Sequence, residues 1–217
     1  MFRITAGPLK LIGVTQSVQF IAGPDGARKR HDTLDHSWTL LLEACGCLAL
    51  PIPNQPHLAS KFLNEIPIDG LLLACGNELA AHGGGAPECD RTEFALLTHA
   101  IHNKLPVLGV GRGMQIIQRL FSVPLQEVDN HIAPVLEIDI SGRRETVNSD
   151  HRFGATESTA DLKVWARADD GVVKAIEDEK RHLTGIMWRP ERRNPFAASD
   201  IELIKRTFDT LDSVAGH

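Results

Sequence analysis

The stretch PVLGVGRGMQ, residues 106–115, has the pattern of a buried strand that enters a glycine-containing turn and continues as a helix. Many α/β hydrolytic enzymes hold a nucleophile at such a turn, because the sharp change of chain direction exposes one side chain. The residue at the turn of this chain is Gly111, which has no side chain. The stretch therefore predicts the backbone of a nucleophile elbow that carries no nucleophile.

Short apolar runs on both sides of this stretch alternate with segments of helical periodicity. Between the first run and the first helical segment, the sequence predicts a polar loop. Strands that alternate with helices are typical of a doubly wound parallel sheet, so we expect a three-layer αβα fold of the α/β class in a single domain, 1–217. The predicted strands cover residues 9–16, 47–54, 68–76 and 105–111, and the predicted helices cover residues 30–46 and 90–104.

The second half of the chain has alternating patterns, which are typical of antiparallel strands. A hairpin is predicted around Ser141 and Gly142. The chain is predicted to end in an amphipathic helix over residues 199–214, capped by Ser199 or Asp200. The sheet is therefore expected to be mostly parallel with a small antiparallel addition. The strand patterns of this half cover residues 134–142, 144–151, 162–170, 171–179 and 181–190.

Composition restricts the partners that we expect. With 217 residues, of which 42% are hydrophobic, the chain can bury a large core. The formal charge of -5, with basic residues spread along the chain, argues against nucleic acid, and no apolar run reaches the ~20 residues that span a membrane. The four cysteines lack paired motifs, so we expect reduced thiols, a cytoplasmic location, no metal and no cofactor.

Five stretches in chain order carry a resemblance to a known family. They are RKRHDTLDHSW (28–38), IDGLLLACGNEL (68–79), KLPVLGVGRGMQIIQ (104–118), ETVNSDHRFG (145–154) and GIMWRPERRNPF (185–196). Together they resemble the class I glutamine amidotransferases, most closely the branch that contains γ-glutamyl-γ-aminobutyrate hydrolase, peptidase C26. The resemblance extends from about residue 10 to residue 212, and it implies the flavodoxin-like fold of that superfamily.

The resemblance implies a Cys-His-Glu triad, in which a thiolate attacks a γ-glutamyl amide and the histidine moves the proton. In this chain Gly111 stands at the nucleophile position, Arg189 stands at the histidine position, and only Glu191 is kept. Glycine cannot form an acyl-enzyme, and a guanidinium cannot act as a base near neutral pH. One replacement alone would suit a chain engineered to trap substrate, whereas two favour a naturally degenerate site.

The resemblance also implies that parts of a binding pocket remain. The backbone N–H groups of Gly76 and Arg112 would form the oxyanion hole. The carboxyl ends of parallel strands share one edge of a sheet, so these positions are expected to meet there. The positions implied for substrate binding are Asn77, Gln115, Asn148, Ser149 and His151.

Two residues of this predicted edge allow more than one interpretation. Arg189 could bind a ligand carboxylate, or it could pair with Glu191 or Glu78 and close the old site. Cys75 could act as a relocated nucleophile with His151 or His82 as its base. We favour the other interpretation, in which Cys75 is a small apolar residue at a strand end. The remaining thiol near this edge, Cys89, is expected to be exposed and without a role.

Three functions follow from these observations. The first is a catalytically degenerate protein that binds a γ-glutamyl compound, glutamine or another small carboxylate, alone, as a homodimer or with a biosynthetic enzyme. The second is an active γ-glutamyl amide hydrolase with chemistry rebuilt around Cys75 and His151. The third is a non-catalytic interaction module with an empty pocket. The sequence does not identify the amine side of a ligand, which the loops at residues 22–30 and 81–88 would contact.

Overall fold

A nine-stranded mixed sheet forms the centre of the computed structural model, which describes residues 9–209. The strands β4, β1, β5, β6 and β13 are parallel, and the remainder of the sheet is antiparallel. The predicted α/β fold with an antiparallel addition is confirmed. In spatial order the strands are β4 (Cys47–Ile52), β1 (Lys10–Thr15), β5 (Gly70–Leu73), β6 (Val107–Val110), β13 (Leu183–Ile186), β12 (Val173–Asp178), β11 (Lys163–Ala168), β8 (Ile132–Ile140) and β9 (Arg143–Asp150).

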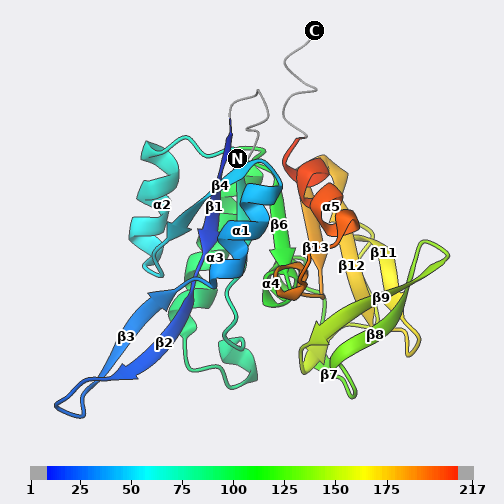
Figure 1. The fold of residues 1–217 in the computed structure, drawn as a ribbon, viewed down its shortest axis with the longest axis horizontal. Coiled ribbons are helices and arrows are strands. Elements are labelled where there is room, and N and C mark those ends of the chain that lie inside the picture. Colours follow the sequence, from blue (N-terminus) through cyan, green and yellow to red (C-terminus); the bar gives the residue numbers. More distant parts are fainter. Residues whose placement is uncertain (1–8, 210–217) are drawn as a thin grey trace, which may run out of the picture.

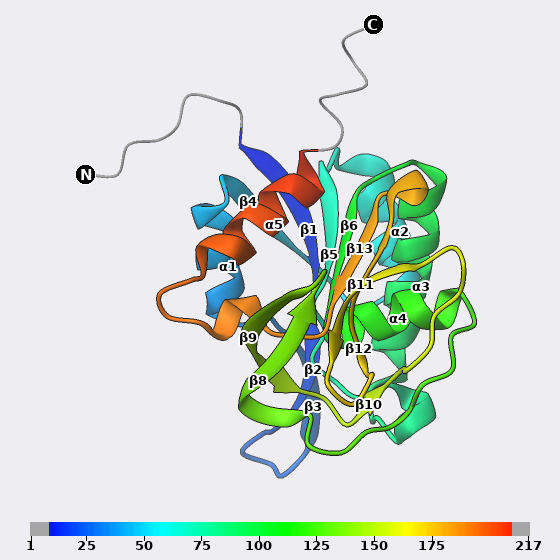
Figure 2. The same ribbon diagram turned by 90° about the vertical axis from the view of Figure 1, so that its right-hand side faces the viewer.

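Helices cover both faces of the parallel part of the sheet, as Figure 2 shows with the sheet nearly edge-on. One layer consists of α1 (His36–Ala44) and α5 (Ala198–Phe208), and the other consists of α2 (Pro56–Glu65), α3 (Pro87–His102) and α4 (Arg112–Leu120). Successive strand residues point to opposite faces, so Leu72 packs toward α1 and α5, whereas Leu71 and Leu73 pack toward α3 and α4. Continuous apolar strands are therefore required here, because both faces are buried.

The predicted hairpin around Ser141 and Gly142 joins β8 to β9. Both turn residues have positive φ, 51° and 87°, which matches the twist of a two-residue hairpin. The Asp139 carboxylate accepts a hydrogen bond from the Gly142 N–H at 2.8 Å and fixes the turn. A separate short pair, β7 (Gln126–Glu127) and β10 (Phe153–Gly154), lies beside this region.

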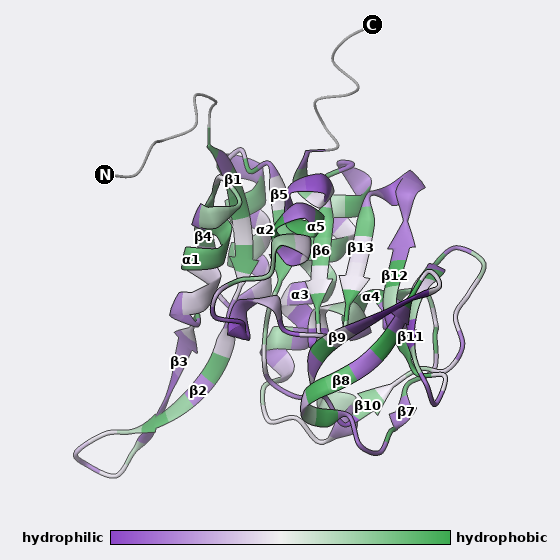
Figure 3. Ribbon diagram, turned by 45° about the vertical axis from the view of Figure 1, so that its right-hand side comes forward, coloured by the Kyte–Doolittle hydropathy of each residue, from purple (hydrophilic) through white to green (hydrophobic). Residues whose placement is uncertain are grey.

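The prediction of a loop after the first strand was wrong. The chain instead forms a two-stranded arm of β2 (Ser17–Ala22) and β3 (Arg28–Thr33), which projects away from the sheet (Figure 1). Strand β3 is hydrophilic (Figure 3) and has no buried face, so it carries no hydrophobic signal for a strand. The helix expected from residue 30 consequently begins only at His36, with Asp35 as its cap.

Two features of the helices also differ from expectation. Helix α2 was not predicted, although Leu58, Ala59, Phe62 and Leu63 recur at helical spacing in its sequence. The last helix begins at Ala198 with Ala197 at the cap position, so the predicted caps Ser199 and Asp200 were wrong. Asp200 instead accepts a hydrogen bond from the Trp188 indole N–H at 2.9 Å. The end of the predicted helix, residues 210–214, lies outside the described residues.

Single turns of 3-10 helix complete the fold at Ala80–His82, Glu179–Arg181 and Pro190–Arg192. Within residues 9–209 no helix is both long and apolar enough to cross a membrane.

Candidate functional site

The elbow predicted from the sequence lies between β6 and α4. Gly111 has φ 55° and ψ -109°, a conformation that L side chains rarely adopt. Its N–H donates to the Ile186 carbonyl at 2.7 Å and so ties the turn to β13. The next helix begins at Arg112, so the elbow directs a helix N-terminus at the carboxyl edge of the sheet.

Arg189 occupies the space in which a side chain at the elbow would lie. A Cβ placed on Gly111 would be 3.3 Å from both Cζ and Nε of Arg189. This guanidinium is 8% exposed, and its Nε has no hydrogen-bond partner within the described residues. Of the two carboxylates considered from the sequence, Glu191 lies within ion-pair distance, with 3.9 Å between Oε1 and Nη1. That separation is too long for a hydrogen bond, so the guanidinium is poorly neutralised.

Glu191, which we expected at the position of the triad glutamate, is also buried. Burial raises the pKa of its carboxyl group, and the charge of Arg189 opposes that rise. Its Oε2 has no hydrogen-bond partner among the described residues. Arg189 therefore keeps a free donor at Nε, and Glu191 keeps a free acceptor at Oε2, within the described residues.

Asn148 holds the backbone at this position. Its Oδ1 accepts from the Arg189 N–H at 2.7 Å, and its Nδ2 donates to the Arg189 carbonyl at 2.8 Å. The Asn148 side chain thus fastens the end of the sheet to the backbone of Arg189. This pairing fixes the backbone from which the Arg189 side chain extends.

Gln115 points to the other side of the elbow. Its Nε2 donates to the Phe153 carbonyl at 2.8 Å, and its buried Oε1 has no partner within residues 9–209. The Phe153 ring stacks on His82, with 3.9 Å between ring centroids. The predicted substrate contact at Gln115 is therefore already engaged by the protein, with one acceptor left over.

A fully buried lysine, Lys174, lies beneath this region and was not foreseen from the sequence. Its Nζ donates to Ser149 Oγ at 2.9 Å and to His151 Nε2 at 2.7 Å, while His151 Nδ1 donates to the Phe153 carbonyl at 3.0 Å. Burial lowers the pKa of Lys174 to about 7. Burial, together with the Lys174 charge, lowers the pKa of His151 to about 3. The available signal was a lysine within the apolar strand VVKAI. Predicting a strand there did not show that the lysine side chain would be buried.

This lysine predicts a pH dependence of stability. Its folded pKa lies below its unfolded value of 10.5, so the unfolded chain binds more protons above about pH 7 and stability rises with pH. Between about pH 7 and pH 8.5, the free energy of unfolding should increase by about 1.5 kcal/mol. Urea denaturation at both pH values measures this, and Lys174→Met should remove most of the increase.

Two features of that experiment isolate Lys174. The exposed Lys180 provides the matched control, since Lys180→Met should leave the increase in place. The measurement stops near pH 8.5 because burial raises the pKa of Cys45 to about 12 and of Cys47 to about 11. Raised thiol pKa values reduce stability as the unfolded cysteines ionise at higher pH. An unchanged pH response in Lys174→Met would contradict the assignment.

Arg112 provides its backbone to the elbow and its side chain to a buried ion cluster. The guanidinium donates to the carboxylates of Asp90 and Glu93, and Glu93 is fully buried. Glu93 also accepts a hydrogen bond from Thr15 Oγ1 at 2.5 Å. The cluster thus connects α4 to α3 and β1, and the Arg112 side chain faces away from the site.

The loop after β5 is bound to the arm. Gly76 N–H donates to Ser17 Oγ at 2.8 Å, so the first proposed oxyanion donor is already engaged. Asn77 pairs with the backbone of Val18 through both its amide atoms, at 2.7 and 2.9 Å. The base of the arm therefore occupies the N–H group of Gly76 and fixes the loop after β5.

Cys75 and Cys89 are both fully buried, so the expectation that Cys89 is exposed was wrong. Both sulfurs lie near Asn77 Oδ1, at 3.4 and 3.5 Å, and a hydrogen bond with the Cys75 thiol raises the pKa of Cys89. Cys89 lies on the buried face of α3 and so enters this cluster. Its sequence neighbours Glu88 and Asp90 are charged, which is why we expected an exposed thiol. Cys75 contacts these groups, whereas His151 contacts Lys174 and Phe153.

A cavity of about 320 Å³ lies on the arm side of Arg189. Sequence reasoning predicted the place of Gly76, Arg189 and Glu191 at this edge, but it had no signal for the arm residues that complete the wall. The cavity contains two guanidinium groups and two carboxylates, so its lining is polar and of mixed charge. It is lined by Ser17, Gln19, Thr33, Leu34, Asp35, Trp38, Ala74, Gly76, Arg189, Glu191 and Arg192.

Comparison with known proteins shows the family to which the chain belongs. A γ-glutamyl-CDP-amidate hydrolase from Campylobacter jejuni is 27% identical over 163 residues, covering 74% of this chain and 80% of the relative. The solved structure of a glutamine amidotransferase from Thermotoga maritima has a TM-score of 0.64 at 12% identity, covering 95% of this chain and 86% of that chain. A family model described as Peptidase C26 matches residues 10–121 and 121–191. The chain therefore belongs to the peptidase C26 family, within the class I glutamine amidotransferase-like superfamily.

Proposed function

We propose that this protein binds a small carboxylate, of the γ-glutamyl class, without hydrolysing it. The observation that carries the proposal is the Arg189 guanidinium, which lies over the bare Cα of Gly111 and borders the 320 Å³ cavity. A cavity of this size matches the lower end of the range for small-molecule sites. The Campylobacter jejuni relative, named as a γ-glutamyl-CDP-amidate hydrolase, supports the ligand class.

Charge and burial make Arg189 the anion contact. The guanidinium is buried, its Nε is unpartnered within residues 9–209, and its acidic neighbour is 3.9 Å away. Bringing a ligand carboxylate to these donors would form charge-assisted hydrogen bonds in a site with little water. The amide bond of the ligand would then lie beside Gly111, which has no group to attack it.

Rebuilt hydrolytic chemistry receives less support from the geometry. The Cys75 thiol is fully buried against Asn77 and Cys89, and the His151 ring is engaged on both nitrogens. A reactive thiol requires a matched base and an accessible path for substrate. Within residues 9–209, Cys75 and His151 share no hydrogen bond, so the binding function is the better match.

A thermal-shift panel tests the proposal. Glutamate, glutamine and γ-glutamyl-γ-aminobutyrate are each added to the wild type, to Arg189→Met and to Arg144→Met. A ligand at a hundred times its Kd should add about 2.7 kcal/mol of stability and raise Tm by about 5–10 °C. Arg189→Met should weaken binding by about 10- to 100-fold, as expected when one charged hydrogen-bond partner is lost.

Two outcomes would overturn the proposal. A flat Tm across the panel would leave the interaction-module function. Release of glutamate from any of these compounds, lost in Cys75→Ala, would instead show an active hydrolase. The Arg144→Met variant controls for general loss of positive charge, because Arg144 is exposed, pairs with Asp169 and does not line the cavity.

A further inference from the structure

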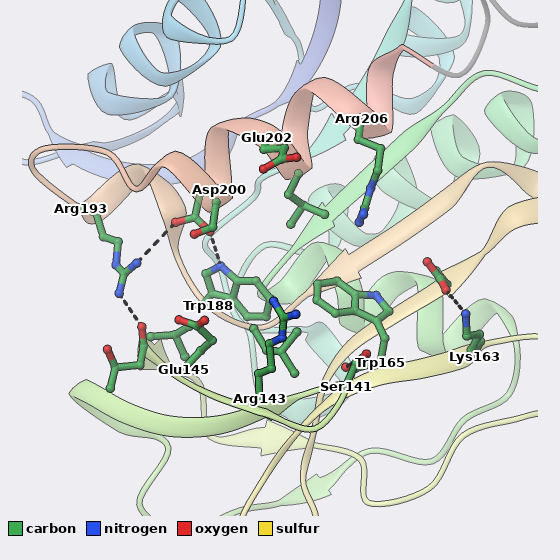
Figure 4. A pocket seen from close by; sticks show the side chains of 16 residues that line it. Ser141, Arg143, Glu145, Lys163, Trp165, Trp188, Arg193, Asp200, Glu202 and Arg206 are labelled. Carbon is green, nitrogen blue, oxygen red and sulfur yellow. Dashed lines mark hydrogen bonds and ion pairs between the residues drawn. The ribbon is translucent and has the colours of Figure 1, made fainter.

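A second cavity, of about 490 Å³, lies away from the elbow between α5 and the strands β9 and β11 (Figure 4). Its wall includes the indole rings of Trp165 and Trp188, which meet edge to face with 5.8 Å between centroids. Trp188 is 4% exposed, and its N–H donates to the buried Asp200. The aromatic wall is thus held in place before any ligand arrives.

Two guanidinium groups at this cavity have no hydrogen-bond or ion-pair partner in the part of the chain that the structure describes. Arg143 comes from the start of β9 and Arg206 from the last turn of α5, so they line the cavity from different elements (Figure 4). Within residues 9–209 neither makes a hydrogen bond or an ion pair, whereas the adjacent Arg144 pairs with Asp169. The other two cations of the cavity are engaged, Lys163 by Glu177 at 2.7 Å and Arg193 by the Thr146 carbonyl at 2.5 Å.

Carboxylates line the same cavity and restrict what it can accept. Glu145 lies two residues after Arg143, and Glu202 lies one helical turn before Arg206. Neither has an ion-pair or hydrogen-bond partner in the described part of the chain. A simple anion would meet these charges without compensation, so a ligand must also offer hydrogen-bond donors. A purely apolar ligand would leave all four charged groups unmatched.

We infer that this cavity binds an aromatic anion of nucleotide size, of the nucleoside monophosphate class. The base packs against the indoles, and the phosphate lies within reach of Arg143 and Arg206. Exocyclic amino or ribose hydroxyl groups donate to Glu145 or Glu202. The cavity volume falls within the range of small-molecule sites. This site is separate from the carboxylate cavity at Arg189 and does not depend on that function.

Titration calorimetry and tryptophan fluorescence test the inference with AMP and CMP as probes. Both nucleotides should bind and change the emission of Trp165 and Trp188. Adenosine, cytidine and inorganic phosphate should each bind at least about 10-fold more weakly, because each lacks one half of the recognised group. The double variant Arg143→Gln with Arg206→Gln should lose at least about 10-fold in affinity.

The controls separate this site from others. Arg144→Gln removes a neighbouring charge that does not line the cavity, so it should bind AMP like the wild type. Arg189→Met should also bind AMP normally. No binding of either nucleotide at about 5 mM overturns the inference. So does binding that the double variant keeps, provided that circular dichroism shows both proteins folded.

Discussion

Replacing Gly111 by cysteine and Arg189 by histidine together is expected to give hydrolysis of a γ-glutamyl amide, whereas Gly111→Cys alone stays inactive. A Cβ on Gly111 would lie 3.3 Å from the guanidinium of Arg189, so a thiol competes with the guanidinium for this space until the arginine is shortened. Histidine would also supply the missing base, which contributes about 10²- to 10⁴-fold in rate. The double variant should therefore exceed either single variant by at least about 10²-fold.

Glutamate release from γ-glutamyl-γ-aminobutyrate measures this gain, and Gly111→Ala with Arg189→His is the control that opens the same space without a thiol. The elbow geometry and Glu191 are already in place. One feature limits the gain, because Ser17 Oγ engages the Gly76 N–H at 2.8 Å. Adding Ser17→Ala should raise the rate further. If the triple variant is no faster than the control, the two replacements are not what removed hydrolysis.

Replacing Arg112 by methionine is expected to cost about 3–5 kcal/mol of stability, the largest loss among these variants. The change leaves the fully buried Glu93 and the largely buried Asp90 without their cation. Breaking a buried ion cluster by removing one partner is costly because the remaining charges have neither water nor a counterion. Urea denaturation near pH 7 measures the loss.

Two further variants test this explanation. Arg119→Met changes an arginine on the same helix whose guanidinium lies over the Phe94 ring, and it should cost less than about 1 kcal/mol. Adding Glu93→Gln to Arg112→Met should recover part of the stability, since it removes the stranded charge and keeps an acceptor for Thr15. A double variant that is no more stable than Arg112→Met would point to lost packing instead of lost charge.

The parallel half of the fold was predictable because burial on both faces forces continuous apolar strands. Leu71 to Leu73 show this, since neighbouring residues enter different halves of the core. The arm was not predictable for the opposite reason. Its strands bury little, so Arg28 to Thr33 carry a polar sequence that looks like a loop. Pairing between two exposed strands leaves no periodic hydrophobic pattern.

The resemblance predicted which residues lie at the site, but it did not predict the contacts that these residues make. From the resemblance we expected Gly111 and Arg189 to stand where the family has a thiol and an imidazole. The sequence could not show that the guanidinium lies over Gly111. Its position depends on the Arg189 backbone, which Asn148 holds through two hydrogen bonds. Lys174 shows the same limit. A lysine in a strand is unremarkable until the fold buries it against His151.

The glycines that flank Gly111 bear on what the elbow motif records. A Cβ on Gly113 would lie 2.1 Å from the Leu73 carbonyl oxygen, and one on Gly109 would lie 2.7 Å from the Gly113 backbone. Both are demanded by the close approach of α4 to the sheet, whatever chemistry the turn performs. A lineage that stopped cutting amides would still be forced to keep them in order to fold. The glycines of this motif therefore report how closely the helix packs on the sheet. They do not report whether the turn carries out catalysis.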